Sequence, residues 1–199
     1  MNEERYVITI SRQFASMGRT IGKTMAKELG IGFYDRDIVE ETARRMHLPI
    51  PEVSMAEEKA GSIFENRKYP LGMGLVSMKQ EIFYVQSNII RDLAKKESCI
   101  IVGRCADMLL KDYDRVLNIY IYAPYEARLK NCVDSLGMDE KTARSMIREV
   151  DRARELYRLR YCEGVKEVFD HRDFMIDSSK YGPEKTSDIL CAVAREALC

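Results

Sequence analysis

The stretch from Ser11 to Thr20, SRQFASMGRT, ends in a glycine, a basic residue and a hydroxyl residue at consecutive positions. This is the end of the phosphate-binding pattern GxxxxGK(S/T), in which main-chain amides and a lysine bind phosphate oxygens and the hydroxyl binds magnesium. Gly18 and Thr20 match the pattern, and Arg19 takes the place of the lysine while keeping its positive charge. The pattern predicts that a phosphate group is bound by five successive residues: Ser16, Met17, Gly18, Arg19 and Thr20.

Three residues of the loop argue against a phosphate-binding conformation. Gln13 replaces the first glycine, and Gln13, Ala15 and Met17 each carry a Cβ atom, which disfavours the positive φ that a phosphate-binding loop uses. The residues after the loop have a helical pattern, and the amides and partial positive charge of a helix N-terminus favour anion binding. An ordinary strand-to-helix turn, with Arg19 and Lys23 in solvent, is the alternative at this point.

A second group of basic residues lies in an arginine-rich stretch over 126–165. Arg144, Arg148 and Arg152 are spaced by four residues, so a helix would place them on one face, where like charges repel mildly. A triphosphate would offset this repulsion, because each arginine guanidinium can bind two phosphate oxygens at once. The alternative is pairing within the helix, as between Glu140 and Arg144, which contributes about 0.2 to 1 kcal/mol per exposed pair.

The elements that must position these residues alternate along the chain. Short runs, most of them rich in β-branched and aromatic residues, predict five strands, over 7–10, 32–34, 99–102, 116–122 and 174–176. Helical apolar periodicity lies between them, and Gly30 is placed to end the first helix. Strands that alternate with helices predict an α/β protein with a parallel sheet covered on both faces. Prolines and glycines over 48–75 indicate a loop-rich insertion.

The composition of the 199-residue chain is that of a globular protein, with 46% hydrophobic and 32% charged residues. The formal net charge is zero, which argues against binding to nucleic acid or to an anionic membrane. No apolar run approaches the roughly 20 residues of a membrane span, and the first five residues lack the features of a signal peptide. Six cysteines without CxxC spacing and only two histidines argue against a zinc site or a disulfide framework and favour a cytoplasmic location.

Four further stretches occur in the order found in nucleoside-monophosphate kinases: LGIGFYDRD (29–37), IIVGRCADMLL (100–110), IYIYAPYEARLKN (119–131) and IREVDRARELYRLRY (147–161). Together with ITISRQF and GRTIGK they resemble the cytidylate kinase-like family. The resemblance implies a P-loop kinase-like three-layer fold with a five-stranded parallel sheet, in one domain over residues 1–199. It also implies an acceptor-binding insertion over 48–80, where the similarity is weakest, and a helical lid over 126–165.

The activity implied by the resemblance is transfer of the γ-phosphoryl group of ATP, with Mg²⁺, to CMP, dCMP or a related monophosphate, so a small-molecule nucleotide is the expected partner. The implied catalytic residues are Arg19, Arg148 and Arg154, and the implied metal ligands are Thr20 and Asp35. The implied acceptor-binding residues are Asp35, Arg104, Asp107, Asp151, Arg154 and Tyr157. The alternatives are a helix N-cap for Asp35 and helix packing for Tyr157.

Two departures from the family pattern affect this chemistry. An aspartate that follows the arginine after the third strand in cytidylate kinase is Cys105 here, and Val102 stands where a magnesium contact would lie. The altered loop and Val102 motivate a second hypothesis, a nucleotide-binding protein of this fold with impaired catalysis. A kinase for another small metabolite is the third hypothesis, because residues 48–80 should line the acceptor pocket. The sequence leaves the oligomeric state open.

Overall fold

A computed structural model describes residues 5–58 and 75–198, apart from 163, 165, 166 and 168. The strands are β1 (Val7–Arg12), β2 (Gly32–Tyr34), β3 (Cys99–Val102), β4 (Val116–Tyr122) and β5 (Phe174–Asp177). They pair in parallel in the order β2-β3-β1-β4-β5 and form one sheet. The five strands and the parallel sheet expected from the sequence are confirmed.

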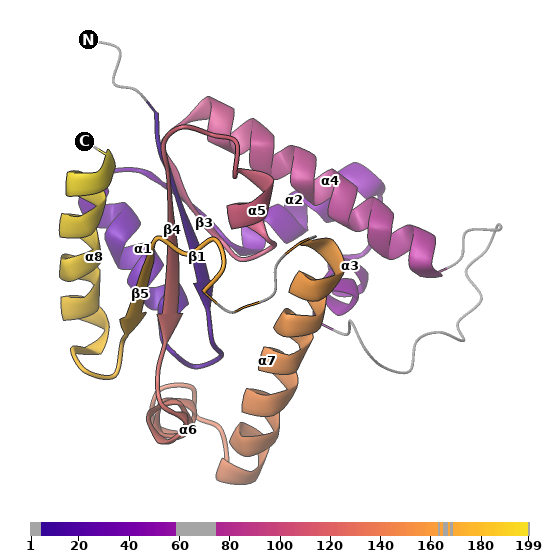
Figure 1. The fold of residues 1–199 in the computed structure, drawn as a ribbon. Coiled ribbons are helices and arrows are strands. Elements are labelled where there is room, and N and C mark those ends of the chain that lie inside the picture. Colours follow the sequence, from indigo (N-terminus) through magenta and orange to yellow (C-terminus); the bar gives the residue numbers. More distant parts are fainter. Residues whose placement is uncertain (1–4, 59–74, 163, 165–166, 168, 199) are drawn as a thin grey trace.

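Helices cover both faces of this sheet and so make three layers (Figure 1). The helices of the described residues are α1 (Gly18–Leu29), α2 (Arg36–Met46), α3 (Ile50–Glu58), α4 (Leu75–Lys96), α5 (Ala106–Leu109), α6 (Tyr125–Asp134), α7 (Glu140–Tyr161) and α8 (Gly182–Leu198). Helices α1 and α8 pack on one face, and α2, α4 and α5 on the other. Within the part of the chain that the structure describes, no helix is both long and apolar enough to cross a membrane.

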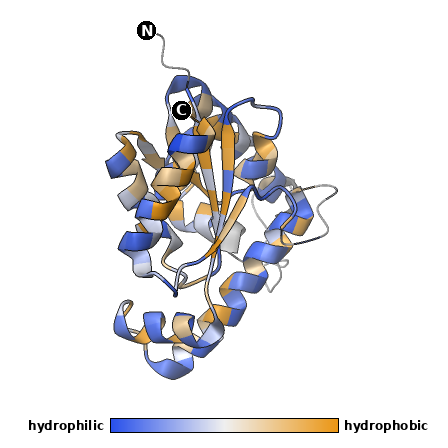
Figure 2. Cartoon of the chain, turned by 60° about the vertical axis from the view of Figure 1, so that its left-hand side comes forward, coloured by the Kyte–Doolittle hydropathy of each residue, from blue (hydrophilic) through white to orange (hydrophobic). Residues whose placement is uncertain are grey.

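The core follows from the alternation of side chains along each strand. Ile8 and Ile10 pack against α1 and α8, whereas Val7 packs against α2 and α4. All four residues of β3 are buried, as expected of an inner strand that helices cover on both faces. The strands are accordingly the most apolar part of the chain, while the outer faces of the helices are hydrophilic (Figure 2).

The order of the strands places the loop after β1 at the centre of one sheet edge. From β1 the chain first forms β2 and β3 on one side and then β4 and β5 on the other. In open α/β sheets, ligands bind beyond the carboxyl ends of the strands at such a switch in direction. Helices α6 and α7 form a hairpin that extends past these carboxyl ends (Figure 1).

The segment 48–75 differs from the expectation of a loop-rich insertion. Helix α3 occupies Ile50–Glu58, and α4 begins at Leu75. Pro51 did not prevent α3, because a proline in the first helical turn removes an N–H group that has no acceptor within the helix. Val53 anchors α3 against α2 and α4. Residues 59–74 of the expected insertion lie outside the described residues, as do 163 and 165 of the expected lid.

Candidate functional site

The loop between β1 and α1 holds two residues in an unusual backbone conformation. Ala15 has a φ of 58° and Met17 a φ of 61°, both in the left-handed region. Their Cβ atoms make this conformation unfavourable, by about 1 to 2 kcal/mol for each residue. Left-handed residues in such turns direct successive amides to one side, where they can bind an anion. The Cβ atoms of Ala15 and Met17 therefore do not keep the backbone out of the left-handed region.

The other predicted phosphate-binding residues lie where this loop joins α1. Ser16 is buried, and its hydroxyl is 3.0 Å from the Gln13 carbonyl and 3.1 Å from the Ile121 carbonyl, so its side chain fixes the loop. Gly18 begins α1, whose first-turn amides have no acceptor within the helix. Thr20 is exposed in the same turn. Main-chain amides and the Thr20 hydroxyl are thus the groups that this junction offers to a phosphate.

Asp35 brings three arginines together next to the loop. Its side chain is almost buried, and its Oδ2 atom lies 2.7 Å from Arg19 Nε. The other oxygen, Oδ1, is 3.5 Å from Arg104 Nη1 and 4.0 Å from Arg12 Nη2. Asp35 occupies the N-cap position of α2 but makes no capping hydrogen bond. The alternative of a capping side chain is therefore wrong, and the carboxylate instead orients guanidinium groups.

A strained turn after β3 positions Arg104 next to Asp35. Gly103, Arg104 and Cys105 have φ values of 78°, 54° and 54°, so three successive residues are left-handed. Such strain persists only where the surroundings enforce it, and it is common at functional sites. A Cβ atom on Gly103 would overlap the guanidinium of Arg12, which explains the glycine. Sequence reasoning did not select Arg12, although its position at the end of β1 is a usable signal.

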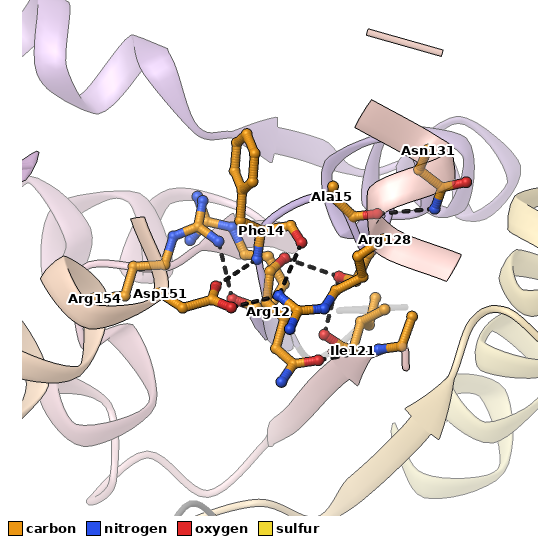
Figure 3. A network of polar contacts seen from close by, with 11 residues as sticks. Arg12, Phe14, Ala15, Ile121, Arg128, Asn131, Asp151 and Arg154 are labelled. Carbon is orange, nitrogen blue, oxygen red and sulfur yellow. Dashed lines mark hydrogen bonds and ion pairs between the residues drawn. The ribbon is translucent and has the colours of Figure 1, made fainter. Parts of the chain in front are cut away.

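The α6–α7 hairpin contacts the main chain of the loop through four side chains (Figure 3). Asp151 accepts a hydrogen bond from the Phe14 amide at 2.7 Å and forms an ion pair with Arg128. Arg154 donates to the Arg12 carbonyl at 3.1 Å. Asp151 and Arg154 were expected to contact substrate, and both lie at the loop. The remaining two side chains are those of Arg128 and Asn131, and Asn131 was not identified from the sequence.

Arg148, expected to be catalytic, lies on a different face of α7. It is exposed and lines an open hollow with Glu140, Lys141 and Arg144. Arg144 Nη2 is 2.6 Å from Glu140 Oε1, which is the pairing within the helix that was the alternative for this stripe. The structure therefore brings Arg154, rather than Arg148, to the loop.

Asp107 lies inside the fold, with 1% of its surface exposed. Its Oδ2 atom accepts hydrogen bonds from Arg158 at 2.6 Å and from Arg172 at 2.7 Å. Burial lowers the pKa of Arg172, and the Asp107 carboxylate opposes this effect by stabilising the charged guanidinium. These three residues form a buried ion-pair cluster that joins α5 to the C-terminal end of α7.

Tyr157 belongs to an aromatic contact between α4 and α7. Its hydroxyl donates to Gln86 Oε1 at 3.2 Å, and its ring meets Phe83 edge to face with centroids 6.1 Å apart. Tyr161 stacks on Phe83 with centroids 4.1 Å apart. Both tyrosines therefore take part in helix packing, the alternative considered for them, and Tyr157 also presents its hydroxyl to a buried amide side chain.

The described residues hold no group of three His, Cys, Asp or Glu side chains that could bind a metal ion. Of the two expected metal ligands, Thr20 is exposed beside the loop, whereas both oxygens of Asp35 lie against arginines. The arrangement is that of a site for an anion: main-chain amides at one side, and guanidinium groups gathered around one carboxylate at the other.

Known proteins resemble this chain in sequence and in fold. A family model described as the cytidylate kinase-like family matches residues 7–180. Among curated proteins, none matches the chain.

Solved structures share the fold over almost the whole chain. An uncharacterized protein from Eubacterium ventriosum ATCC 27560 is 25% identical, with a TM-score of 0.72 over 96% of this chain and 99% of that one. The shikimate kinase from Acinetobacter baumannii, in complex with shikimate, is 15% identical, with a TM-score of 0.56 and coverage of 99% and 97%. A gluconokinase from Sinorhizobium meliloti 1021 is 14% identical, with a TM-score of 0.53 and coverage of 98% and 95%.

Proposed function

Because the chain belongs to the cytidylate kinase-like family and has the fold of P-loop kinases, we propose that it transfers the γ-phosphoryl group of ATP to CMP, dCMP or a related nucleoside monophosphate. The observation that carries this proposal is the convergence of Arg12, Arg19 and Arg104 on Asp35 beside the loop after β1. One guanidinium group can bind two phosphate oxygens at once, so this cluster suits an acceptor that carries a phosphate.

The loop is the site proposed for the phosphates of ATP. The first-turn amides of α1 and the positive end of its dipole favour anions. The Phe14 amide is occupied by Asp151 at 2.7 Å, so the donors proposed for phosphate are the first-turn amides of α1. The Thr20 hydroxyl suits Mg²⁺ that is held mainly by nucleotide oxygens, and bound Mg²⁺ would neutralise part of their charge. Asp35 would serve as a ligand only by exchanging Arg19 for the ion.

The residues of the chain then position two substrates rather than react with them. Arg19 lies between the loop and Asp35, where its charge can stabilise the transferred group. Arg104 and Asp35 orient the acceptor, and Arg154 on α7 adds positive charge near the phosphates. Phosphoryl transfer depends mostly on positioning and charge stabilisation, so a strong general base is not required.

A second candidate is a kinase for a small carboxylate metabolite. The cluster around Asp35 favours it, because a pair of guanidinium groups binds a carboxylate as readily as a phosphate. Two structures with this fold are a shikimate kinase in complex with shikimate and a gluconokinase. The remaining hypothesis, nucleotide binding with impaired catalysis, is motivated by the strained Ala15 and Met17 of the loop.

Formation of ADP from ATP and Mg²⁺ tests these functions, with CMP, dCMP, UMP, AMP, shikimate and gluconate as acceptors. We expect CMP or dCMP to give the highest rate, and Arg104→Ala to lower kcat/KM by about 100-fold. Arg152→Ala, a matched change at an exposed position of α7, should have little effect. ADP formed with shikimate or gluconate alone would favour the second candidate. Binding of ATP without formation of ADP from any acceptor would favour the hypothesis of impaired catalysis. A kcat/KM of Arg104→Ala equal to that of the wild type would refute the acceptor site.

A further inference from the structure

The loop raises a question that its own residues do not answer. Glycine adopts the left-handed conformation freely, but residues 15 and 17 are alanine and methionine, and both are left-handed here. Strained backbone of this kind persists only when neighbouring structure holds it in place. The groups that hold the loop must therefore come from elsewhere in the fold.

Polar side chains of the α6–α7 hairpin bind three successive parts of this backbone (Figure 3). The Phe14 peptide is bound from both sides, its N–H by Asp151 at 2.7 Å and its carbonyl by Arg128 at 3.4 Å. The Ala15 carbonyl accepts a hydrogen bond from Asn131 Nδ2 at 2.9 Å. The orientation of this carbonyl depends on the left-handed conformation of Ala15, so the Asn131 hydrogen bond fixes that conformation.

Two features make these contacts firm. Arg128 and Asp151 also pair with each other, so each holds the other in place against the Phe14 peptide. The Arg128 side chain is 9% exposed, and little water competes for its hydrogen bonds. The side chains of Phe14 and Ala15, in addition, pack against the apolar core between α6 and α7. Polar and apolar contacts therefore join the loop and the hairpin into one unit.

We propose that Asn131 and the Asp151–Arg128 pair are positioning residues, which hold the loop after β1 in its phosphate-binding conformation and replace the conformational freedom of glycine. The inference rests on the proposed role of this loop in phosphate binding. In this proposal the α6–α7 hairpin holds the loop in place and also contributes arginine side chains to the site. The proposal also predicts that affinity for phosphate depends on Asn131, whose side chain donates a hydrogen bond to the Ala15 carbonyl.

A double-variant comparison tests the inference. Asn131→Ala should weaken binding of ATP with Mg²⁺, and of inorganic triphosphate, by about tenfold, the effect of one lost hydrogen bond. It should also speed hydrogen exchange of the amides over residues 14–17 in the ligand-free protein. In an Ala15→Gly background the same change should cost about twofold or less, since glycine is left-handed without strain. Asn131→Leu keeps a similar size but removes the donor and should act like Asn131→Ala.

The control is Lys130→Ala, an exposed change at the neighbouring position of α6, which should alter neither binding nor exchange. Equal losses in the alanine and glycine backgrounds would overturn the inference, as would unchanged exchange over 14–17 in both Asn131 variants. Exchange is measured without ligand, so it decides the inference even if wild-type protein binds neither ATP nor triphosphate. Failure of the wild-type protein to bind ATP or triphosphate would refute the proposed function instead.

Discussion

Replacing Asp107 with asparagine should destabilise the protein severely, because Asp107 lies between two buried guanidinium groups. Asp107 is 1% exposed, and the side chains of Arg158 and Arg172 are 17% and 2% exposed. Asparagine keeps the shape and one oxygen acceptor but leaves both positive charges without a carboxylate. Removing one partner of a buried ion pair typically costs about 3 to 5 kcal/mol, and the retained acceptor places this variant near 3 kcal/mol.

Urea unfolding followed by circular dichroism measures this loss. With a slope of about 2 kcal/mol per molar urea, the expected loss lowers the midpoint by about 1.5 M. Arg172→Leu in the Asp107→Asn protein should recover part of the loss, because one of the two unpaired charges is removed. The matched control is Glu140→Gln, whose partner Arg144 lies on the surface, and it should barely move the midpoint.

A midpoint shift below about 0.5 M at unchanged slope would refute this reasoning. The family resemblance assigns Asp107 to the acceptor, and the two roles separate in the same experiment. A residue that contacts the acceptor would raise the KM of the acceptor while the midpoint stays in place. For Asp107→Asn we expect the opposite: the fall of the urea midpoint should be the dominant effect, and the change in the KM of the acceptor the smaller one.

Three further predictions concern single residues. Gly103→Ala should lower the free energy of unfolding by about 1 to 2 kcal/mol, since φ is 78° there, and should weaken acceptor binding by displacing Arg12; equal affinity for CMP would contradict the second part. Burial raises the pKa of the Cys99 thiol to about 12, so iodoacetamide at pH 8 should label Cys99 in guanidinium chloride but not in the native protein. Hydrogen bonds from the Thr142 hydroxyl and amide hold the pKa of Asp139 below its ordinary value of 3.8. The difference in Tm between wild type and Asp139→Ala should therefore be constant from pH 7 to 5 and shrink below pH 3.8, whereas a constant difference at pH 2 would contradict the capping role.

The strands and the first helix could be predicted from the sequence because their signals are local. Cys99–Val102 is apolar at every position and Val7–Ile10 at all but Thr9, as is typical of strands in a parallel sheet covered on both faces. Gly30 ends α1 in the left-handed conformation that was expected of it. The segment from Ile50 was misjudged, since Pro51 in the first helical turn and Pro49 just before the helix were taken as a sign of loop.

The candidate site was predictable only in part. Arg19 was selected from the phosphate-binding pattern, and Asp35 and Arg104 from the family resemblance, and the three do meet. Asn131 carries no local pattern that separates it from surface residues, and Arg12 offers only its position at the end of β1. Their importance comes from contacts with residues about 90 or more positions away, such as Gly103, and with the loop backbone.

What the sequence determined by itself is the periodicity of each element and the family, because both depend on neighbouring residues in a fixed order. Helical spacing showed that Arg144 and Arg148 share a face, but it could not show which face of α7 meets the body. Packing of α7 against α6 and α3 decided that, and it turned Asp151, Arg154 and Arg158 inward instead. The free energy that selects a helix face comes from burial against other elements, and the tertiary structure alone specifies those partners.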